Sequence, residues 1–195
     1  TDATECAGCK PGTFRNLTDA CENCPRGFYT DTHDNRGCNM CPLGYYAKDQ
    51  TNESKYDECQ SCPRGKHGAT TTATTMNEGC NDCTSGRYSD LEANDHLDDC
   101  KGCPKGKWSS SLGATKESAC HFCSTGKYGI DGEGANNETS CTQCENGQYL
   151  DLVGEFGSSS CKGCPLGFFS KRKRSSLLFA MYAGNLQQQS RYICV

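Results

Sequence analysis

The chain has 195 residues, of which 19 are Cys and 22 are Gly, and a formal net charge of −4. This cysteine content is typical of a disulfide-stabilised scaffold in an oxidising compartment, and it argues against a single domain with a large apolar core. The acidic balance argues against nucleic acid or an anionic membrane as a partner, because both would require a basic face.

One pattern, C-x-x-C-x-x-G-x-aromatic, recurs nine times along the chain. A Gly follows the second Cys by three residues in every copy, and two residues later stands an aromatic residue, or His67 in one copy. The copies start 15 and 17 residues apart at first and 20 or 21 apart afterwards, a spacing typical of stacked supersecondary units. The cysteine pairs are Cys6/Cys9, Cys21/Cys24, Cys38/Cys41, Cys59/Cys62, Cys80/Cys83, Cys100/Cys103, Cys120/Cys123, Cys141/Cys144 and Cys161/Cys164.

Each repeat is expected to form a short β-hairpin. The Gly can adopt a positive φ and turn the chain, and the residues after it, such as 28–30, 45–47 and 107–109, favour extended backbone. A polar loop then returns the chain to the next Cys pair. The sequence therefore predicts a disulfide-rich, all-β or irregular fold: an elongated rod of about eight to nine stacked hairpin units with almost no helix.

The repeats divide the chain into three parts: a first partial repeat over residues 1–20, tandem repeats over 21–170, and a divergent or disordered tail over 171–195. The tail holds the basic run 171–174, whose alternative reading is a secretory convertase site, and an apolar run too short to span a membrane. Because the chain begins at Thr1 without a leader sequence, we expect a removed signal peptide or a longer extracellular protein.

Sequence alone leaves the disulfide connectivity open. We expect the second Cys of each pair to bond the first Cys of the next, because each bridge then closes one hairpin. The alternative joins neighbouring pairs first to first and second to second. The expected bridges are Cys9–Cys21, Cys24–Cys38, Cys41–Cys59, Cys62–Cys80, Cys83–Cys100, Cys103–Cys120, Cys123–Cys141, Cys144–Cys161 and Cys164–Cys194, which leaves Cys6 without an assigned partner. We expect the aromatic residue to cover the bridge, and the repeat with His67 to be the least stable.

Two other uses of C-x-x-C were considered. Paired motifs at this spacing can build zinc sites from four thiolates, but the fixed Gly and aromatic positions have no role in a zinc ribbon. A thioredoxin-type redox site would require a cysteine at a helix N-terminus, and the pattern predicts no such helix. Three N-glycosylation sequons, at Asn16, Asn52 and Asn137, favour a secretory route and therefore disulfides.

The sequence predicts no catalytic set and no cofactor. The four His residues stand at unrelated positions of the repeat, so repeat logic assembles no nucleophile and base. An acidic loop over 89–99 could hold calcium, but it lacks the Gly of an EF-hand loop, which favours a solvated face. The calcium candidates in that loop are Asp90, Glu92, Asn94, Asp95, Asp98 and Asp99.

Several copies, such as 21–30 and 161–170, read C-x-x-C-P-x-G-x-[FY]-[ST]. This motif resembles the cysteine-rich repeats of the tyrosine-kinase ephrin type A/B receptor-like family, over roughly residues 5–170. It is also similar to the first half of tumour-necrosis-factor-receptor repeats, without the Cys pairs that complete them. The resemblance implies an extracellular, disulfide-laddered spacer or protein-interaction surface, and it does not imply ephrin binding. Four copies lack the Pro.

The leading hypothesis is an extracellular structural spacer or protein-interaction module without catalysis, with a protein partner that the sequence does not identify. The first alternative is the ligand-binding ectodomain of a cell-surface receptor, which a contiguous exposed aromatic patch would favour. The second alternative is an intracellular zinc-binding array, in which the thiols would be free and the metal bound.

Overall fold

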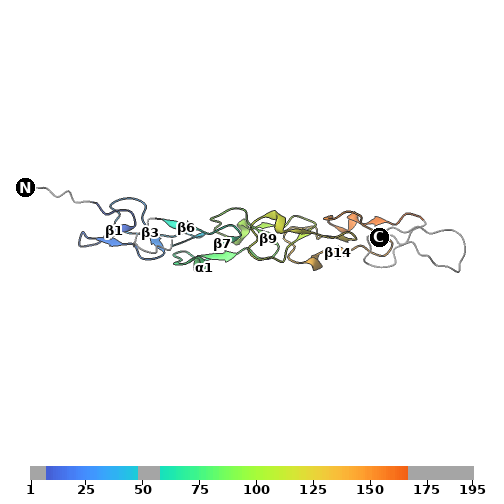
Figure 1. Cartoon of the computed structure of the whole chain (residues 1–195), viewed down its shortest axis with the longest axis horizontal. Helices are drawn as coiled ribbons and strands as arrows, with labels where there is room; N and C mark the ends of the chain where they lie inside the picture. Colours follow the sequence, from blue (N-terminus) through green and yellow to red (C-terminus); the bar gives the residue numbers. More distant parts are fainter. Residues whose placement is uncertain (1–7, 48–57, 167–195) are drawn as a thin grey trace, which may run out of the picture. The chain divides into compact units, whose positions relative to one another are not determined.

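The computed structural model of the chain describes residues 8–47 and 58–166. These residues form eight separate two-stranded antiparallel hairpins (Figure 1). The hairpins pair β1 (Thr13–Arg15) with β2 (Cys21–Asn23), β3 (Phe28–Tyr29) with β4 (Asn39–Met40), β5 (Tyr45–Ala47) with β6 (Cys59–Ser61), β7 (Lys66–Gly68) with β8 (Cys80–Asp82), β9 (Arg87–Tyr88) with β10 (Lys101–Gly102), β11 (Lys107–Trp108) with β12 (His121–Phe122), β13 (Lys127–Tyr128) with β14 (Thr142–Gln143), and β15 (Gln148–Tyr149) with β16 (Lys162–Gly163).

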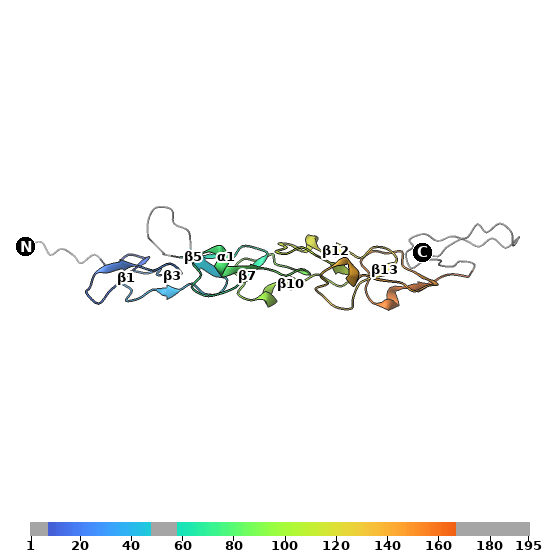
Figure 2. The ribbon, with the colours of Figure 1, turned by 90° about the horizontal axis from the view of Figure 1, so that it is seen from below.

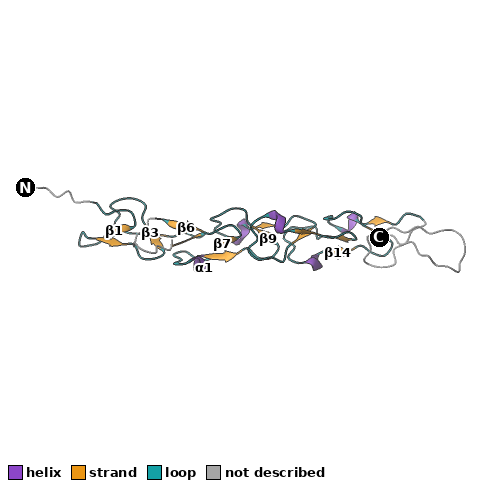
Figure 3. Ribbon diagram, in the orientation of Figure 1, coloured by secondary structure: helices purple, strands orange, loops and turns teal. Residues whose placement is uncertain are grey.

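In the part of the chain that the structure describes, helix is confined to single turns that directly precede the first Cys of a pair (Figure 3). The amide of that Cys closes each turn by donating to the carbonyl of the turn's first residue. Side chains cap some of the turns, as where Thr75 Oγ1 accepts from the Glu78 amide. The turns are α1 (Met76–Gly79), η1 (Leu97–Asp99), η2 (Glu117–Ala119), η3 (Glu138–Ser140) and η4 (Ser158–Ser160). The predicted fold class, disulfide-rich hairpins with almost no helix, is confirmed.

All eight hairpins share one register. The residue in the aromatic slot pairs with the residue directly after the first Cys of the next pair, as Trp108 pairs with His121 and Tyr149 with Lys162. The amide of the second Cys then donates to the carbonyl of the turn glycine, as Cys123 does to Gly106 over 2.9 Å. Each C-x-x-C from Cys21/Cys24 to Cys141/Cys144 therefore serves as the second strand of one hairpin and as the start of the next.

The glycine of the motif turns the chain as expected. Eight of the nine motif glycines lie in the described residues, and all eight have φ between +74° and +85°. An L-residue with a Cβ rarely adopts this conformation, which explains why every copy has Gly at this position. The ninth, Gly167, lies outside the described residues.

The hairpins form two compact units. The first comprises Thr1–Cys83 with Ser89–Cys100, and the second comprises Thr84–Tyr88 with Lys101–Val195. Within each unit the hairpins follow one another in chain order (Figure 2). Buried residues are mostly cystines and small side chains, and Tyr88 and Leu150 are the only larger apolar side chains that are buried in the described part of the chain. Disulfides therefore take the place of an aliphatic core.

In six of the eight described hairpins, a second turn in the loop, which we call the docking turn, joins the hairpin to the one before it. Its first residue has a positive φ, and in the second unit the Gly134 amide donates to the Cys103 carbonyl over 2.9 Å. The Ala135 carbonyl, at its second residue, then accepts from the Ser109 amide over 3.0 Å. The docking turns are 34–35, 72–73, 93–94, 113–114, 134–135 and 154–155.

The docking turn also reaches the hairpin before that one. In the first unit a Cβ on Gly44, in the third hairpin, would lie 2.7 Å from the carbonyl oxygen of Asn94 in the fifth. In the second unit a Cβ on Gly106, in the sixth hairpin, would overlap the carbonyl oxygen of Gly154 in the eighth. Gly27 and Gly86 meet Thr72 and Gly134 in the same way. At these four positions the motif glycine thus has two roles, as a turn and as the seat of a loop two repeats further on.

Candidate functional site

The repeated Cys joints are disulfides. Eight bridges join the second Cys of one pair to the first Cys of the next, with Cα–Cα separations between 5.4 and 5.9 Å. Within residues 8–47 and 58–166, no bridge joins neighbouring pairs first Cys to first Cys or second Cys to second Cys. The bridges are Cys9–Cys21, Cys24–Cys38, Cys41–Cys59, Cys62–Cys80, Cys83–Cys100, Cys103–Cys120, Cys123–Cys141 and Cys144–Cys161.

The remaining cysteines are Cys6, Cys164 and Cys194. Cys164 is disulfide-bonded, and its partner lies outside the described residues, as do Cys6 and Cys194 themselves. The expected Cys164–Cys194 bridge therefore stays a prediction. Since the sulfurs of the eight described bridges are bonded to one another, they are not available as zinc thiolates. In the described ranges no three His, Cys, Asp or Glu side chains form a cluster that could hold a metal ion.

In two described repeats the residue in the aromatic slot covers a disulfide, but the bridge is that of the following repeat. Tyr88 of the fifth hairpin packs in one buried cluster with Ala114 and with both cysteines of the Cys103–Cys120 bridge. Tyr128 of the seventh hairpin packs in the same way on Cys144 and Cys161 of the eighth. The ring therefore links two repeats. We expected it to cover a bridge, and it covers the bridge of the next repeat.

Burial of the first Cys depends on the helical turn before it. Cys100, Cys120, Cys141 and Cys161 each follow a 3₁₀ turn and are buried. Cys21 closes the shortest described loop, no helical turn precedes it, and its side chain is exposed. The 20-residue repeats thus have room for a turn that shields the bridge, and the 15-residue first repeat does not.

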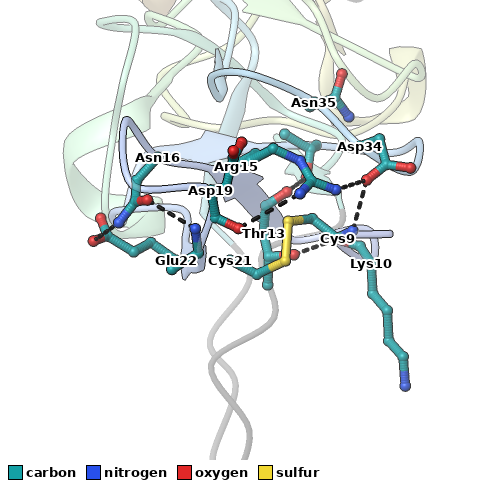
Figure 4. Close-up of a disulfide and its surroundings, with 12 residues drawn as sticks. Cys9, Lys10, Thr13, Arg15, Asn16, Asp19, Cys21, Glu22, Asp34 and Asn35 are labelled. Carbon is teal, nitrogen blue, oxygen red and sulfur yellow. Dashed lines mark hydrogen bonds and ion pairs between the residues drawn. A yellow bond between two sulfur atoms is a disulfide. The ribbon is translucent and has the colours of Figure 1, made fainter. Parts of the chain in front are cut away.

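Polar contacts tie the first hairpin to the second (Figure 4). Asp34, in the docking turn of the second hairpin, accepts hydrogen bonds from the Arg15 guanidinium at 2.7 Å and from the Cys9 amide at 2.9 Å. The hydrogen bond from Arg15, followed by that from the Cys9 amide, lowers the pKa of the Asp34 carboxyl. The Asp34 carboxylate therefore remains charged and contributes to this joint except under acid conditions.

The acidic loop of the fifth hairpin makes hydrogen bonds within itself and to the fourth hairpin. The buried Asn94 amide donates to Ser89 Oγ and, at 3.1 Å, to the Lys66 carbonyl of the fourth hairpin. Asp99 Oδ2 accepts from the His96 amide at 3.0 Å, and this bond is the largest cause that lowers the pKa of Asp99. These contacts give the loop a role in joining two hairpins. The calcium hypothesis gains no support from them.

Histidine side chains also have structural neighbours. The His67 ring is half-buried, and its Nδ1 lies 2.9 Å from the Gly68 carbonyl oxygen. The His121 ring lies across the strand pair from Trp108, with 5.3 Å between ring centroids and a 51° tilt. The expected low stability of the repeat with His67 stays a prediction.

Two of the three sequons lie in the described residues. The Asn137 side chain is exposed, and its Oδ1 accepts hydrogen bonds from the amide and hydroxyl of Thr139. Asn16 Oδ1 accepts from the amide and hydroxyl of Thr18, while its Nδ2 donates to Glu22 Oε1 at 2.6 Å. Asn52 lies outside the described residues, as does the basic run 171–174.

Three exposed apolar side chains lie near Gly154 of the second unit, either in contact with it or close to it in the chain. Phe122 approaches Gly154 so closely that a Cβ there would overlap the ring, and Phe122, Val153 and Phe156 are all exposed. Two cations lie over the rings, Lys107 Nζ 4.6 Å from the Phe122 centroid and Lys105 Nζ 5.0 Å from that of Phe156. We call Phe122, Val153 and Phe156 the Phe122 patch.

Comparison with known families supports the resemblance seen in the repeats. A family model described as tyrosine-protein kinase ephrin type A/B receptor-like matches residues 12–57 and 132–176. A comparison with curated proteins gives no match. Within the described residues, the structure has no helix with the length and apolar character needed to cross a membrane.

Proposed function

We propose that this tandem array of ephrin-receptor-like repeats is an extracellular, non-catalytic protein-interaction module. One observation carries the proposal. Many positions shared by the repeats are engaged within the chain, since the described cysteines form bridges, four motif glycines seat docking turns, and Tyr88 and Tyr128 cover bridges. Recognition of a partner is therefore left to the residues that differ between repeats, at the exposed loops.

The Phe122 patch favours one place for the contact. Aromatic residues are enriched at protein interfaces, where their rings supply apolar area, and the stems of neighbouring Lys side chains can extend that area. Lys105 and Lys107 are each also paired with a carboxylate, Asp131 and Glu117. The rim is thus polar and the centre apolar. This observation supports the narrower candidate function, a ligand-binding ectodomain.

Binding to cell surfaces tests the proposal. The labelled, secreted chain is expected to bind saturably to some member of a panel of cultured cells, measured by flow cytometry. Replacing Phe122 and Phe156 by Ser is expected to weaken that binding about tenfold or more. The matched control is Leu91→Ser, which removes an exposed aliphatic side chain from the first unit. Equal loss in the control and the patch variant would contradict the patch, and absence of saturable binding throughout would contradict the module.

We also propose that Asn16, Asn52 and Asn137 carry N-linked glycans. Asn137 is the best supported, because it is exposed and only its Oδ1 is engaged by Thr139. When the chain is expressed through a secretory pathway, its mass is expected to fall on treatment with a glycosidase. The untreated Asn137→Gln variant is expected to be lighter than the unchanged chain by the mass of one glycan. Asn136→Gln is the matched control, because Asn136 is followed by Asn137 and Glu138 and so is not in a sequon. An unchanged mass in Asn137→Gln would contradict the assignment.

A further inference from the structure

A depression of about 330 Å³ lies in the second unit, between the seventh and eighth hairpins. Tyr128 borders it from the seventh hairpin, and the remaining lining residues belong to the eighth hairpin and its 3₁₀ turn η4. Its volume is at the small end of the range for ligand sites in proteins. The lining residues are Tyr128, Glu145, Gln148, Ser158, Ser159 and Cys161.

Comparison with the two preceding repeats shows why the depression is there. In the sixth hairpin Lys107, directly after the motif glycine, bonds Glu117 at the start of η2 over 2.6 Å. In the seventh, Lys127 bonds Glu138 at the start of η3 over 2.7 Å. These Lys side chains are only 19% and 14% exposed, so each lies along the hairpin as a cover.

The eighth hairpin has neither member of that pair. Gln148 stands at the position of Lys107 and Lys127, and Ser158 stands at the position of Glu117 and Glu138. Both replacements are shorter, and the space that the Lys–Glu pair spans in the preceding repeats is open here. Within the described residues, the side chains of Gln148 and Ser158 make no hydrogen bond.

We propose that this depression binds one ring of a neutral saccharide. Tyr128, whose ring also packs against the Cys144–Cys161 bridge, lines the depression and would give a bound sugar its aromatic contact. The Gln148 amide, the Glu145 carboxylate and the two serine hydroxyls provide donors and acceptors for vicinal hydroxyl groups. No lining residue is a cation and one is a carboxylate, which disfavours phosphate, sulfate and acidic peptides. The lining is also too polar to favour an apolar ligand.

The proposal is independent of the protein-interaction function, because the Phe122 patch and the depression share no residue. We expect a Kd of about 1 mM, since a small polar ligand in an open depression gains little beyond the cost of association. Binding of this strength becomes useful when several sugars on one surface are engaged together.

Titration followed by amide NMR tests the proposal. The folded, disulfide-bonded chain is titrated with methyl mannoside, methyl galactoside and N-acetylglucosamine separately. At least one sugar is expected to give saturable shifts at the amides of Tyr128, Gln148 and Ser158. Gln148→Lys with Ser158→Glu, which restores the pair seen in the two preceding repeats without a change in net charge, is expected to weaken that binding at least tenfold, with the thermal midpoint unchanged or raised.

A second variant keeps the test independent of folding defects. Glu145→Gln preserves the size of that side chain, and it is expected to change affinity without a change in the midpoint. Absence of saturable shifts with all three sugars would overturn the proposal. Undiminished binding in the Lys–Glu variant would also overturn it, because the sugar would then lie elsewhere.

Discussion

Replacement of Gly106 by Ala is expected to destabilise the second unit by about 3 kcal/mol or more. Its φ of +74° costs an Ala residue roughly 1–2 kcal/mol. In addition, the new Cβ would overlap the carbonyl oxygen of Gly154, so the docking turn of the eighth hairpin would have to move. Loss of the close contact between Gly106 and Gly154 should therefore weaken the packing between the sixth and eighth hairpins. Urea unfolding can be followed by the fluorescence of Trp108, the single Trp of the chain.

Gly147→Ala is the matched control in the same unit. Gly147 has a φ of +84°, but a Cβ there would meet no atom within 4 Å. Its replacement should therefore cost only the backbone strain, roughly 1–2 kcal/mol. The difference between the two variants measures the contribution of the docked turn. Equal destabilisation would show that the glycines serve as turns only and that contacts between alternate repeats contribute nothing.

Removal of the Cys103–Cys120 bridge by paired Ala substitutions is expected to cost about 4–5 kcal/mol. The bridge spans 17 residues, and closing a loop of this length contributes about 3 kcal/mol by restricting the unfolded chain. The rest comes from packing, because both sulfurs lie in a buried cluster with Tyr88 and Ala114, and their removal leaves a cavity there. The free energy of unfolding is measured by urea denaturation with the other bridges intact.

Removal of the Cys9–Cys21 bridge is the comparison that separates the two contributions. Its separation of 12 residues gives a loop-closure term of nearly the same size, about 3 kcal/mol. Cys9 is buried but Cys21 is exposed, so less packing is lost than with Cys103 and Cys120, which are both buried. We therefore expect a smaller total cost than for Cys103–Cys120. Peptide mapping under non-reducing conditions must show the remaining bridges unchanged, and an equal cost for both removals would rule out the packing contribution.

Much of the hairpin could be predicted from the sequence, because its determinants are local. A Gly three residues after the second Cys makes the turn, and the extended residues after it pair with the next C-x-x-C over fewer than 20 residues. The pairing of second Cys with first Cys follows from the same closeness, although sequence left an alternative open. The saccharide depression could also have been suspected from sequence, since Gln148 and Ser158 depart from the Lys and Glu of the two preceding repeats.

The docking turns were missed, although a signal for them is present. A residue with positive φ stands seven or eight residues after the motif glycine, as Gly113, Gly134 and Gly154 do in the later repeats. In the earlier repeats the same position holds Asp34, Thr72 or Ala93, and of these only Asp is a residue type that is enriched at positive φ. Only the contacts with the preceding hairpins stabilise that conformation there.

The hairpins, their turn glycines and the disulfide-based core follow from the sequence, since they depend on contacts between residues close in the chain. The neighbour against which each hairpin packs is seen only in the folded structure. Tyr88 covers the bridge of the next repeat, and Gly106 seats Gly154 from the repeat after that. Such contacts depend on how one hairpin is placed on another. A repeated motif does not specify that placement, because every copy offers the same residues to every other.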